Sequence, residues 1–174
     1  MRINGFTLIE LLITISIAGI LTAFAIPTFS DMIRNARLTA ITNDLITSVN
    51  LARSTAISRG ETITIKAKND NWQEGWTVET LNCVDNCVLK DYQALRAGYT
   101  LRGNIGNSLS FQSNGSSENA GNMILCANDE VQPYHVKLLK INYIGRISVA
   151  TDTNQNGIPE LDGVDITICN IKAT

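Results

Sequence analysis

The sequence predicts an α+β fold, in which a long N-terminal helix packs on a C-terminal antiparallel β domain of two small sheets. Twenty residues without a charge, from Leu11 to Ser30, open the helical part, and a helical apolar pattern continues to Arg59. After Gly60 come short runs rich in Val, Ile, Thr and Tyr, separated by Asn, Gly and Asp, which is the pattern of strands and turns. About eight such strands fit two packed sheets better than one.

Length and charge limit the classes of protein that the chain can represent. Its 174 residues fit about one ordinary domain with an appendage, which is too short for most multidomain enzymes. The net charge of -2 gives no overall cationic field. Binding to nucleic acid or to an anionic membrane surface would therefore need a local patch.

The uncharged segment 11–30 has the length of about 20 residues that a helix needs to cross a lipid bilayer. Glu10 stands at its start, and an ionised carboxylate in a membrane helix costs about 2.5 to 3.5 kcal/mol, so it usually marks a function. Two ordinary alternatives are a signal peptide ending at the A-x-A pattern of residues 23–25 and a simple membrane anchor. Neither alternative gives Glu10 a role.

The residues GFTLIE at positions 5–10 resemble the class III signal of type IV pilins and of type II secretion pseudopilins. The resemblance implies a type IV pilin-like fold, cleavage after Gly5 by a prepilin peptidase, and methylation of the new amine of Phe6. Residues 1–5 are then a leader peptide, and residues 6–30 a hydrophobic transmembrane and assembly helix. In a filament Glu10 would meet the Phe6 ammonium of a neighbouring subunit, and this attraction is strong at low dielectric.

Residues 31–59 predict an amphipathic continuation of this helix, and residues 60–174 the β-rich globular domain. Apolar residues recur at steps of three and four, and Gly60 is a stop signal. These apolar residues are Leu38, Ile41, Leu45, Val49, Ala52 and Ala56. A helix from Phe6 to Arg59 would reach about 80 Å. Pro27 should kink or loosen it, because its ring removes one backbone hydrogen bond.

Landmarks in the β domain narrow the resemblance to minor pilins of the GspH/FimT/FimU family. In order, they are Gly75-Trp76, Phe111 with Asn114-Gly115, Ile124-Leu125-Cys126 and Gly145-Arg146. The resemblance implies a low-copy subunit of a pilus tip or priming complex that promotes pilus assembly, for twitching, adhesion or DNA uptake. The implied partners are the major pilin, other minor pilins, a prepilin peptidase and the inner-membrane assembly platform. The implied location is the bacterial inner membrane, as a single-pass protein, and after assembly the pilus, periplasm or cell surface.

Two other functions remain open within the same resemblance. FimT-like members bind DNA through a Gly-Arg-x-Arg motif, but here Ser148 replaces the second Arg. The candidate phosphate contacts are Arg146, Lys137, Lys140 and Lys172. A solvated charge after a turn is the favoured interpretation of Arg146. The other function is that of a GspH-like pseudopilin of type II secretion, whose sequence signals overlap almost fully with those of a pilin.

The chain has four cysteines, which permit three pairings. Disulfides persist in the compartments to which an exported domain is delivered. We predict that Cys83 pairs with Cys87 and that Cys126 pairs with Cys169. A zinc site is the alternative, but such a site usually needs two close pairs of ligands, and the chain has one C-x3-C spacing.

The segment 152–160 begins like a calcium loop, with oxygen-bearing side chains at alternate positions before a glycine. Its candidate ligands are Asp152, Asn154, Asn156, Ile158 and Glu160. The twelfth position is Gly163, where a bidentate acid is expected. An Asn/Gly-rich hairpin turn is therefore favoured over a metal site.

The sequence contains no recognisable catalytic motif. HExxH, GxSxG and P-loop patterns are absent. His135 is the one histidine, lies in a strand-like run, and is expected to be a structural residue. The chain is expected not to be an enzyme and, calcium apart, to need no cofactor.

Overall fold

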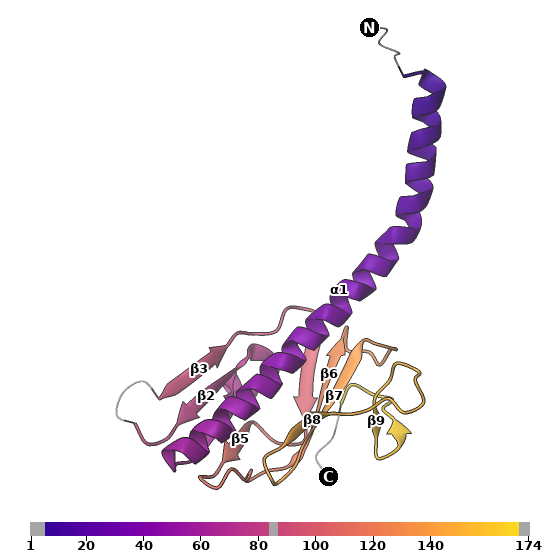
Figure 1. Cartoon of the computed structure of the whole chain (residues 1–174). Helices are drawn as coiled ribbons and strands as arrows, with labels where there is room; N and C mark the ends of the chain where they lie inside the picture. Colours follow the sequence, from indigo (N-terminus) through magenta and orange to yellow (C-terminus); the bar gives the residue numbers. More distant parts are fainter. Residues whose placement is uncertain (1–5, 84–86, 171–174) are drawn as a thin grey trace.

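The computed structural model describes residues 6–83 and 87–170. A single helix, α1 (Leu8–Arg59), precedes all the strands and is continuous through Pro27. Figure 1 shows that its N-terminal half projects from the molecule, that the helix curves, and that its C-terminal half lies on the β domain. The proline that was expected to kink the helix therefore lies inside it and does not end it.

The end of α1 follows from the conformation of Gly60. This residue has a φ of 67°, in the left-handed region that glycine adopts without steric cost, and its N–H donates to the Ala56 carbonyl at 2.9 Å. The predicted stop at Gly60 is confirmed.

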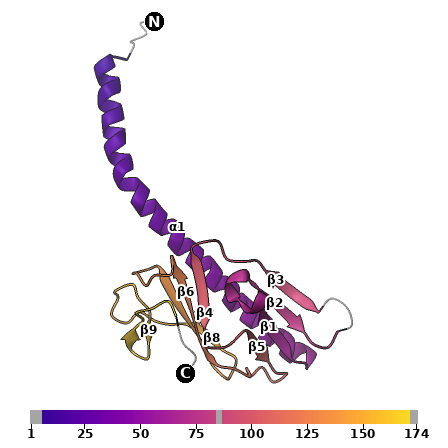
Figure 2. The ribbon, with the colours of Figure 1, turned by 180° about the vertical axis from the view of Figure 1, so that it is seen from behind.

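Two four-stranded antiparallel sheets make up the β domain (Figures 1 and 2). The first has the order β3-β2-β1-β5, with β1 (Ile63–Ala67), β2 (Trp76–Thr80), β3 (Val88–Tyr92) and β5 (Ser108–Phe111). The second has the order β4-β6-β7-β8, with β4 (Tyr99–Gly103), β6 (Gly121–Ala127), β7 (Val136–Ile141) and β8 (Ile147–Val149). Two 3-10 turns, η1 (Lys68–Asp70) and η2 (Trp72–Glu74), connect β1 to β2.

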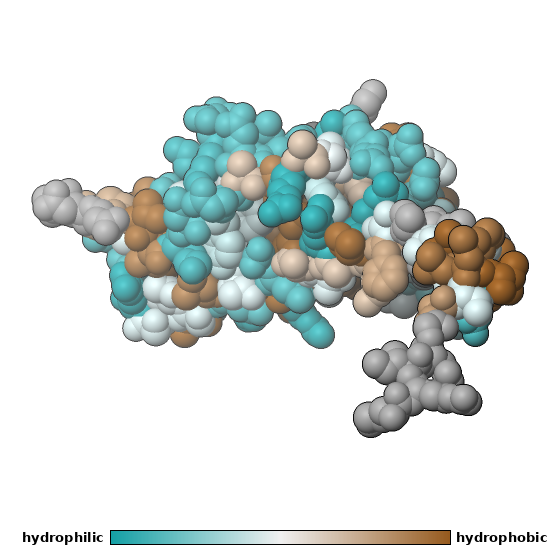
Figure 3. Space-filling model, turned by 90° about the horizontal axis from the view of Figure 1, so that it is seen from above, coloured by the Kyte–Doolittle hydropathy of each residue, from teal (hydrophilic) through white to brown (hydrophobic). Residues whose placement is uncertain are grey.

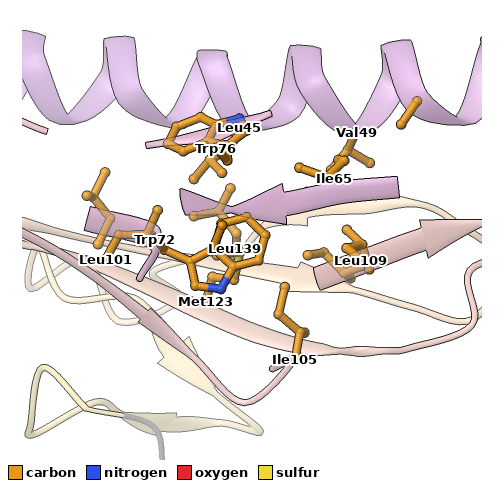
Figure 4. Close-up of a cluster of buried hydrophobic side chains, with 14 of the residues drawn as sticks. Leu45, Val49, Ile65, Trp72, Trp76, Leu101, Ile105, Leu109, Met123 and Leu139 are labelled. Atoms are coloured by element: carbon orange, nitrogen blue, oxygen red, sulfur yellow. The ribbon is translucent and has the colours of Figure 1, made fainter. Parts of the chain in front are cut away.

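The main core lies where α1 meets both sheets. Figure 4 shows Leu45 and Val49 of the helix above Trp76 and Ile65 of the first sheet. Met123 and Leu139 of the second sheet are buried in the same cluster. Of the apolar helix residues expected in this core, Leu38, Leu45, Val49, Ala52 and Ala56 are buried and Ile41 is half-buried. The predicted α+β class and the two sheets are confirmed.

A second apolar cluster covers the opposite face of the β4-β6-β7-β8 sheet. Ile124 and Leu138 of this face pack against Ile166 and Cys169 from the end of the chain. Before this segment the chain forms a short hairpin of β9 (Glu160–Leu161) and β10 (Val164–Asp165), with Asp162 and Gly163 at positive φ in the turn between them.

Candidate functional site

Thr7 and Glu10 together build the N-terminus of α1. The Thr7 hydroxyl accepts a hydrogen bond from the Glu10 N–H at 3.3 Å. The Glu10 carboxylate accepts from the Thr7 N–H at 2.9 Å and from its hydroxyl at 2.7 Å. This reciprocal capping box satisfies backbone donors that the first turn leaves unpaired, and it places a negative charge at the positive end of the helix dipole.

The structure therefore gives Glu10 a local role beside the intermolecular one expected from the sequence. Glu10 is exposed, as are Phe6 and Thr7 before it. The pattern T-x-x-E at residues 7–10 is itself the sequence signature of a capping box. It could have identified Thr7, which the sequence analysis missed. Gly5, the expected cleavage position, lies outside the described residues.

The N-terminal part of α1 exposes many large apolar side chains. They are Leu8, Ile9, Leu11, Leu12, Ile13, Ile15, Ile17, Ile20 and Leu21, with Phe6 before them and Phe29, Met32 and Ile33 after them. Figure 3 shows this part as a hydrophobic projection beside a domain face that is mostly hydrophilic. Soluble monomers rarely expose contiguous apolar surface of this kind, so the helix is an interaction element.

In the part of the chain that the structure describes, no helix combines the length and the apolar character that crossing a membrane requires.

Asp31 of α1 contacts a residue of the β domain. Its Oδ1 lies 3.5 Å from Arg34 Nη1 and 3.5 Å from His135 Nε2. The His135 side chain is largely buried in this contact, between β6 and β7. The expectation of a structural histidine matches this position.

The candidate DNA contacts are not gathered on one surface. Lys137 and Lys140 are three residues apart on β7, where they pair with Leu125 and Asn122, so they point to opposite faces of the sheet. Arg146 lies in the exposed turn after β7, and Lys172 lies outside the described residues. Strand alternation therefore separates Lys137 from Lys140, so the two lysines cannot both lie beside Arg146 on one face, and DNA binding stays a prediction.

The candidate calcium ligands are hydrogen-bonded within their own loop. The Asp152 carboxylate accepts from the Asn156 N–H at 3.1 Å and the Gly157 N–H at 2.7 Å. Glu160 Oε1 accepts from the N–H groups of residues 153 and 154 at 3.2 and 3.3 Å. Asn154 and Asn156 also donate through their side-chain amides to Asp165.

These bonds are those of a polar turn, which is the interpretation favoured from the sequence. Ile158 contributes its N–H to the Asn156 side chain. Within residues 6–83 and 87–170, no three His, Cys, Asp or Glu side chains are grouped so that they could hold a metal ion. Calcium binding at this loop stays a prediction.

The structure joins the cysteines in the two pairs expected from the sequence, Cys83 with Cys87 and Cys126 with Cys169. The first pair joins two cysteines that precede β3 and are four positions apart in the sequence. The second links β6 to the end of the chain, and both of its cysteines are buried in the second apolar cluster.

Comparison with protein families gives two matches. The family model described as type II transport protein GspH matches residues 42–140, which is more than half of the chain. A model of the prokaryotic N-terminal methylation motif matches residues 1–26. Together the two models match the N-terminal part of the helix, its C-terminal part and the β domain as far as residue 140.

Individual relatives are similar over shorter stretches. A fimbrial protein of Pseudomonas aeruginosa is 37% identical over 80 residues, which are 45% of this chain and 51% of that protein. Fimbrial protein Q of Moraxella bovis is 39% identical over 72 residues, which are 41% of this chain and 45% of that protein. The chain thus spans about half the length of the relatives that it matches.

The fold is similar to that of a solved minor pilin. The crystal structure of the type IV minor pilin FimU of Pseudomonas aeruginosa superposes with a TM-score of 0.57. The match covers 76% of this chain and 94% of that one, at 22% sequence identity. At this identity the similarity shows the shared fold.

Proposed function

Because the chain belongs to the GspH family of minor pilins and pseudopilins, we propose that it is a minor type IV pilin that promotes assembly of a pilus from its tip or priming complex. The apolar part of α1 joins the helical core of the filament, and the β domain contacts other subunits. Before assembly the same apolar surface is covered by lipid of the inner membrane.

One observation carries this proposal: a helix of 52 residues uses only its C-terminal half to build the domain core. In the other half, the large apolar side chains that the structure describes are exposed, and they need partners of the same kind. Helices that associate in a lipid-like environment gain mainly from close packing. A bundle of such helices from neighbouring subunits supplies this packing.

Glu10 is proposed to select the position of the subunit within that bundle. In a bundle of apolar helices its carboxylate would be in a medium of low dielectric. The Phe6 ammonium of a neighbouring subunit would approach it there. An unpaired carboxylate buried there would be costly, and the ion pair offsets this cost. The proposal predicts that removal of the charge alone impairs incorporation.

The test compares two substitutions in the native host. Glu10→Gln removes the charge but keeps an acceptor for the capping box, since Gln also serves at this position. Glu10→Val removes both. If the charge acts between subunits, both variants accumulate in the membrane fraction and are depleted from sheared pili about equally. Wild-type amounts of Glu10→Gln in pili would show that only the cap matters.

Cleavage after Gly5 is tested separately. A Gly5→Val precursor should keep its leader and remain in the membrane fraction, whereas the wild-type chain loses it. Immunoblots of cells with and without the prepilin peptidase give the two reference sizes. Normal trimming of the Gly5→Val chain would contradict the proposed processing.

A pseudopilin of type II secretion is the second candidate function, because the family model that matches carries the description of a type II transport protein. Deletion of the gene separates the two. A pilus subunit is expected to change the number of surface pili and leave secreted enzymes unchanged, and a pseudopilin is expected to do the reverse.

A further inference from the structure

An exposed apolar patch lies at the end of the β domain that is farthest from the N-terminus of α1. It consists of Ile57 in the last turns of the helix and of Tyr143 and Ile144 in the turn between β7 and β8, and we call it the distal patch. Their exposed fractions are 52%, 66% and 66%. Figure 1 shows the end of α1 at the opposite end of the molecule from the N-terminus.

The backbone of the distal patch is fixed by hydrogen bonds and close packing. The Tyr143 carbonyl accepts from the Ser117 N–H at 2.9 Å, which ties the turn to the preceding loop. Asn142 closes the turn, since its carbonyl accepts from the Gly145 N–H at 2.9 Å and its side chain accepts from the Arg146 N–H at 2.9 Å. A surface that is already ordered loses less entropy on binding.

Packing joins this turn to the helix. Gly145 has a φ of +76°, and a Cβ at this position would lie 2.2 Å from the Gly115 carbonyl oxygen. A Cβ at Gly115 would lie 2.7 Å from Ile57 Cδ1. Arg53 Nε donates to the same Gly115 carbonyl at 3.0 Å. Ile57 and the turn with Tyr143 therefore belong to one rigid surface.

The charge beside the distal patch is positive, although the whole chain has a net charge of -2. Arg53, Arg59 and Arg146 lie in or next to it, and only Arg59 forms an ion pair within the described residues, with Glu61 at 3.6 Å. Tyrosine and arginine are both enriched at the centre of protein interfaces. The rim favours a partner with acidic residues.

We propose that the distal patch binds an acidic surface on the globular domain of another pilin-type subunit. This rests on the proposed function. The membrane is excluded as the occupant by distance, because α1 is about 78 Å long and its apolar half is at the other end. The contact lets the β domain, and not the helix alone, decide which subunit comes next.

The test places a photo-crosslinking amino acid, p-benzoyl-phenylalanine, at Tyr143 in the full chain in its native host. The matched control is the same amino acid at Val164, which is 67% exposed on the β9–β10 hairpin. We expect an adduct from position 143 and none from 164. Mass spectrometry should identify the partner as a different protein that begins with a prepilin-type signal.

A second substitution checks that the patch itself makes the contact. Ile144→Asp, combined with the crosslinker at 143, should reduce the adduct at least about tenfold, as expected for a central apolar contact placed beside an acidic partner. Val164→Asp should not reduce it. Thermal unfolding of each variant shows that the exposed changes leave the domain folded.

The outcomes separate the two proposals. In one outcome the chain is trimmed and present in pili, but position 143 gives no adduct, or an adduct with lipid, nucleic acid or a second copy of the chain. This outcome overturns the proposed role of the distal patch and leaves the proposed function standing. A chain that is absent from pili with unchanged pilus number overturns the proposed function, and with it the patch.

Discussion

Gly145 illustrates how one residue without a side chain holds the turn after β7 in place. Gly145→Ala is expected to lower the free energy of unfolding by more than about 2 kcal/mol. A left-handed alanine costs about 1 to 2 kcal/mol, and the added Cβ also meets the Gly115 carbonyl. Thermal unfolding measures the loss.

Gly163 provides the matched control. It has a φ of +82°, but a Cβ there would have no atom within 4 Å. Gly163→Ala should therefore lose only the conformational part, about 1 to 2 kcal/mol. Equal losses in the two variants would mean that the contact of Gly145 with Gly115 contributes nothing.

Asp129 is expected to make stability depend on pH. Arg102 donates to both of its carboxylate oxygens, at 2.5 and 3.2 Å, and these hydrogen bonds, helped by the Thr100 hydroxyl, lower the pKa of Asp129 from its ordinary value. A carboxyl with a lowered folded-state pKa stabilises the fold above its ordinary pKa of about 4. This contribution disappears as the pH falls through the lowered value.

The comparison of wild type with Asp129→Asn tests this. The variant should be less stable at about pH 7, and the difference should disappear once the pH has fallen below the lowered pKa of Asp129. It should be modest, because the pair is exposed. Urea unfolding at a series of pH values measures it, and a difference that stays constant with pH would exclude the ionised Asp129 as its cause.

At the scale of elements, the disulfide between Cys126 and Cys169 holds the end of the chain against the second sheet. By the loop-entropy model, a closed loop with a sequence separation of 43 stabilises by about 4 kcal/mol, and one with a separation of 4 by about 2 kcal/mol. Replacing Cys126 and Cys169 by alanine should therefore lower the melting temperature more than replacing Cys83 and Cys87 by alanine. The opposite order would show that the end of the chain does not depend on its disulfide.

The elements also show what a sequence can and cannot predict. The spacing of Leu38, Leu45 and Val49 predicted the helix and its buried face, because a period of 3.6 is a local property of the chain. The short runs rich in Val, Ile, Thr and Tyr predicted most strands in the same way. The packing of Ile166 and Cys169 was not predictable in this way, because these side chains cover a sheet whose strands lie earlier in the sequence.

The residues of the candidate site also differ in how far the sequence predicts them. Glu10 is recognisable because a lone acid beside an apolar run is costly, whichever fold follows. The grouping of Lys137, Lys140 and Arg146 was not predictable from proximity in sequence, because strand geometry decides which face each one occupies. The distal patch combines α1 with the turn between β7 and β8, and these parts become neighbours only in the folded domain.

For the whole molecule, the account depends on the apolar start of the chain being retained as the part that enters the filament. The same 52-residue helix builds the domain core with its C-terminal half and exposes the apolar surface on its N-terminal half. One continuous element therefore connects the folded domain to the surface proposed to enter the filament. The distal patch and the apolar half of α1 lie at opposite ends, as a subunit needs if it is to contact neighbours along a filament.

The most direct test is the N-terminus of the mature protein isolated from its native host. Intact mass and N-terminal sequencing should find a chain that begins at a methylated Phe6 and retains the whole of α1. A mature chain that begins at Ile26 would contradict the account, because the exposed apolar half of the helix would have been removed and nothing would remain to join a filament.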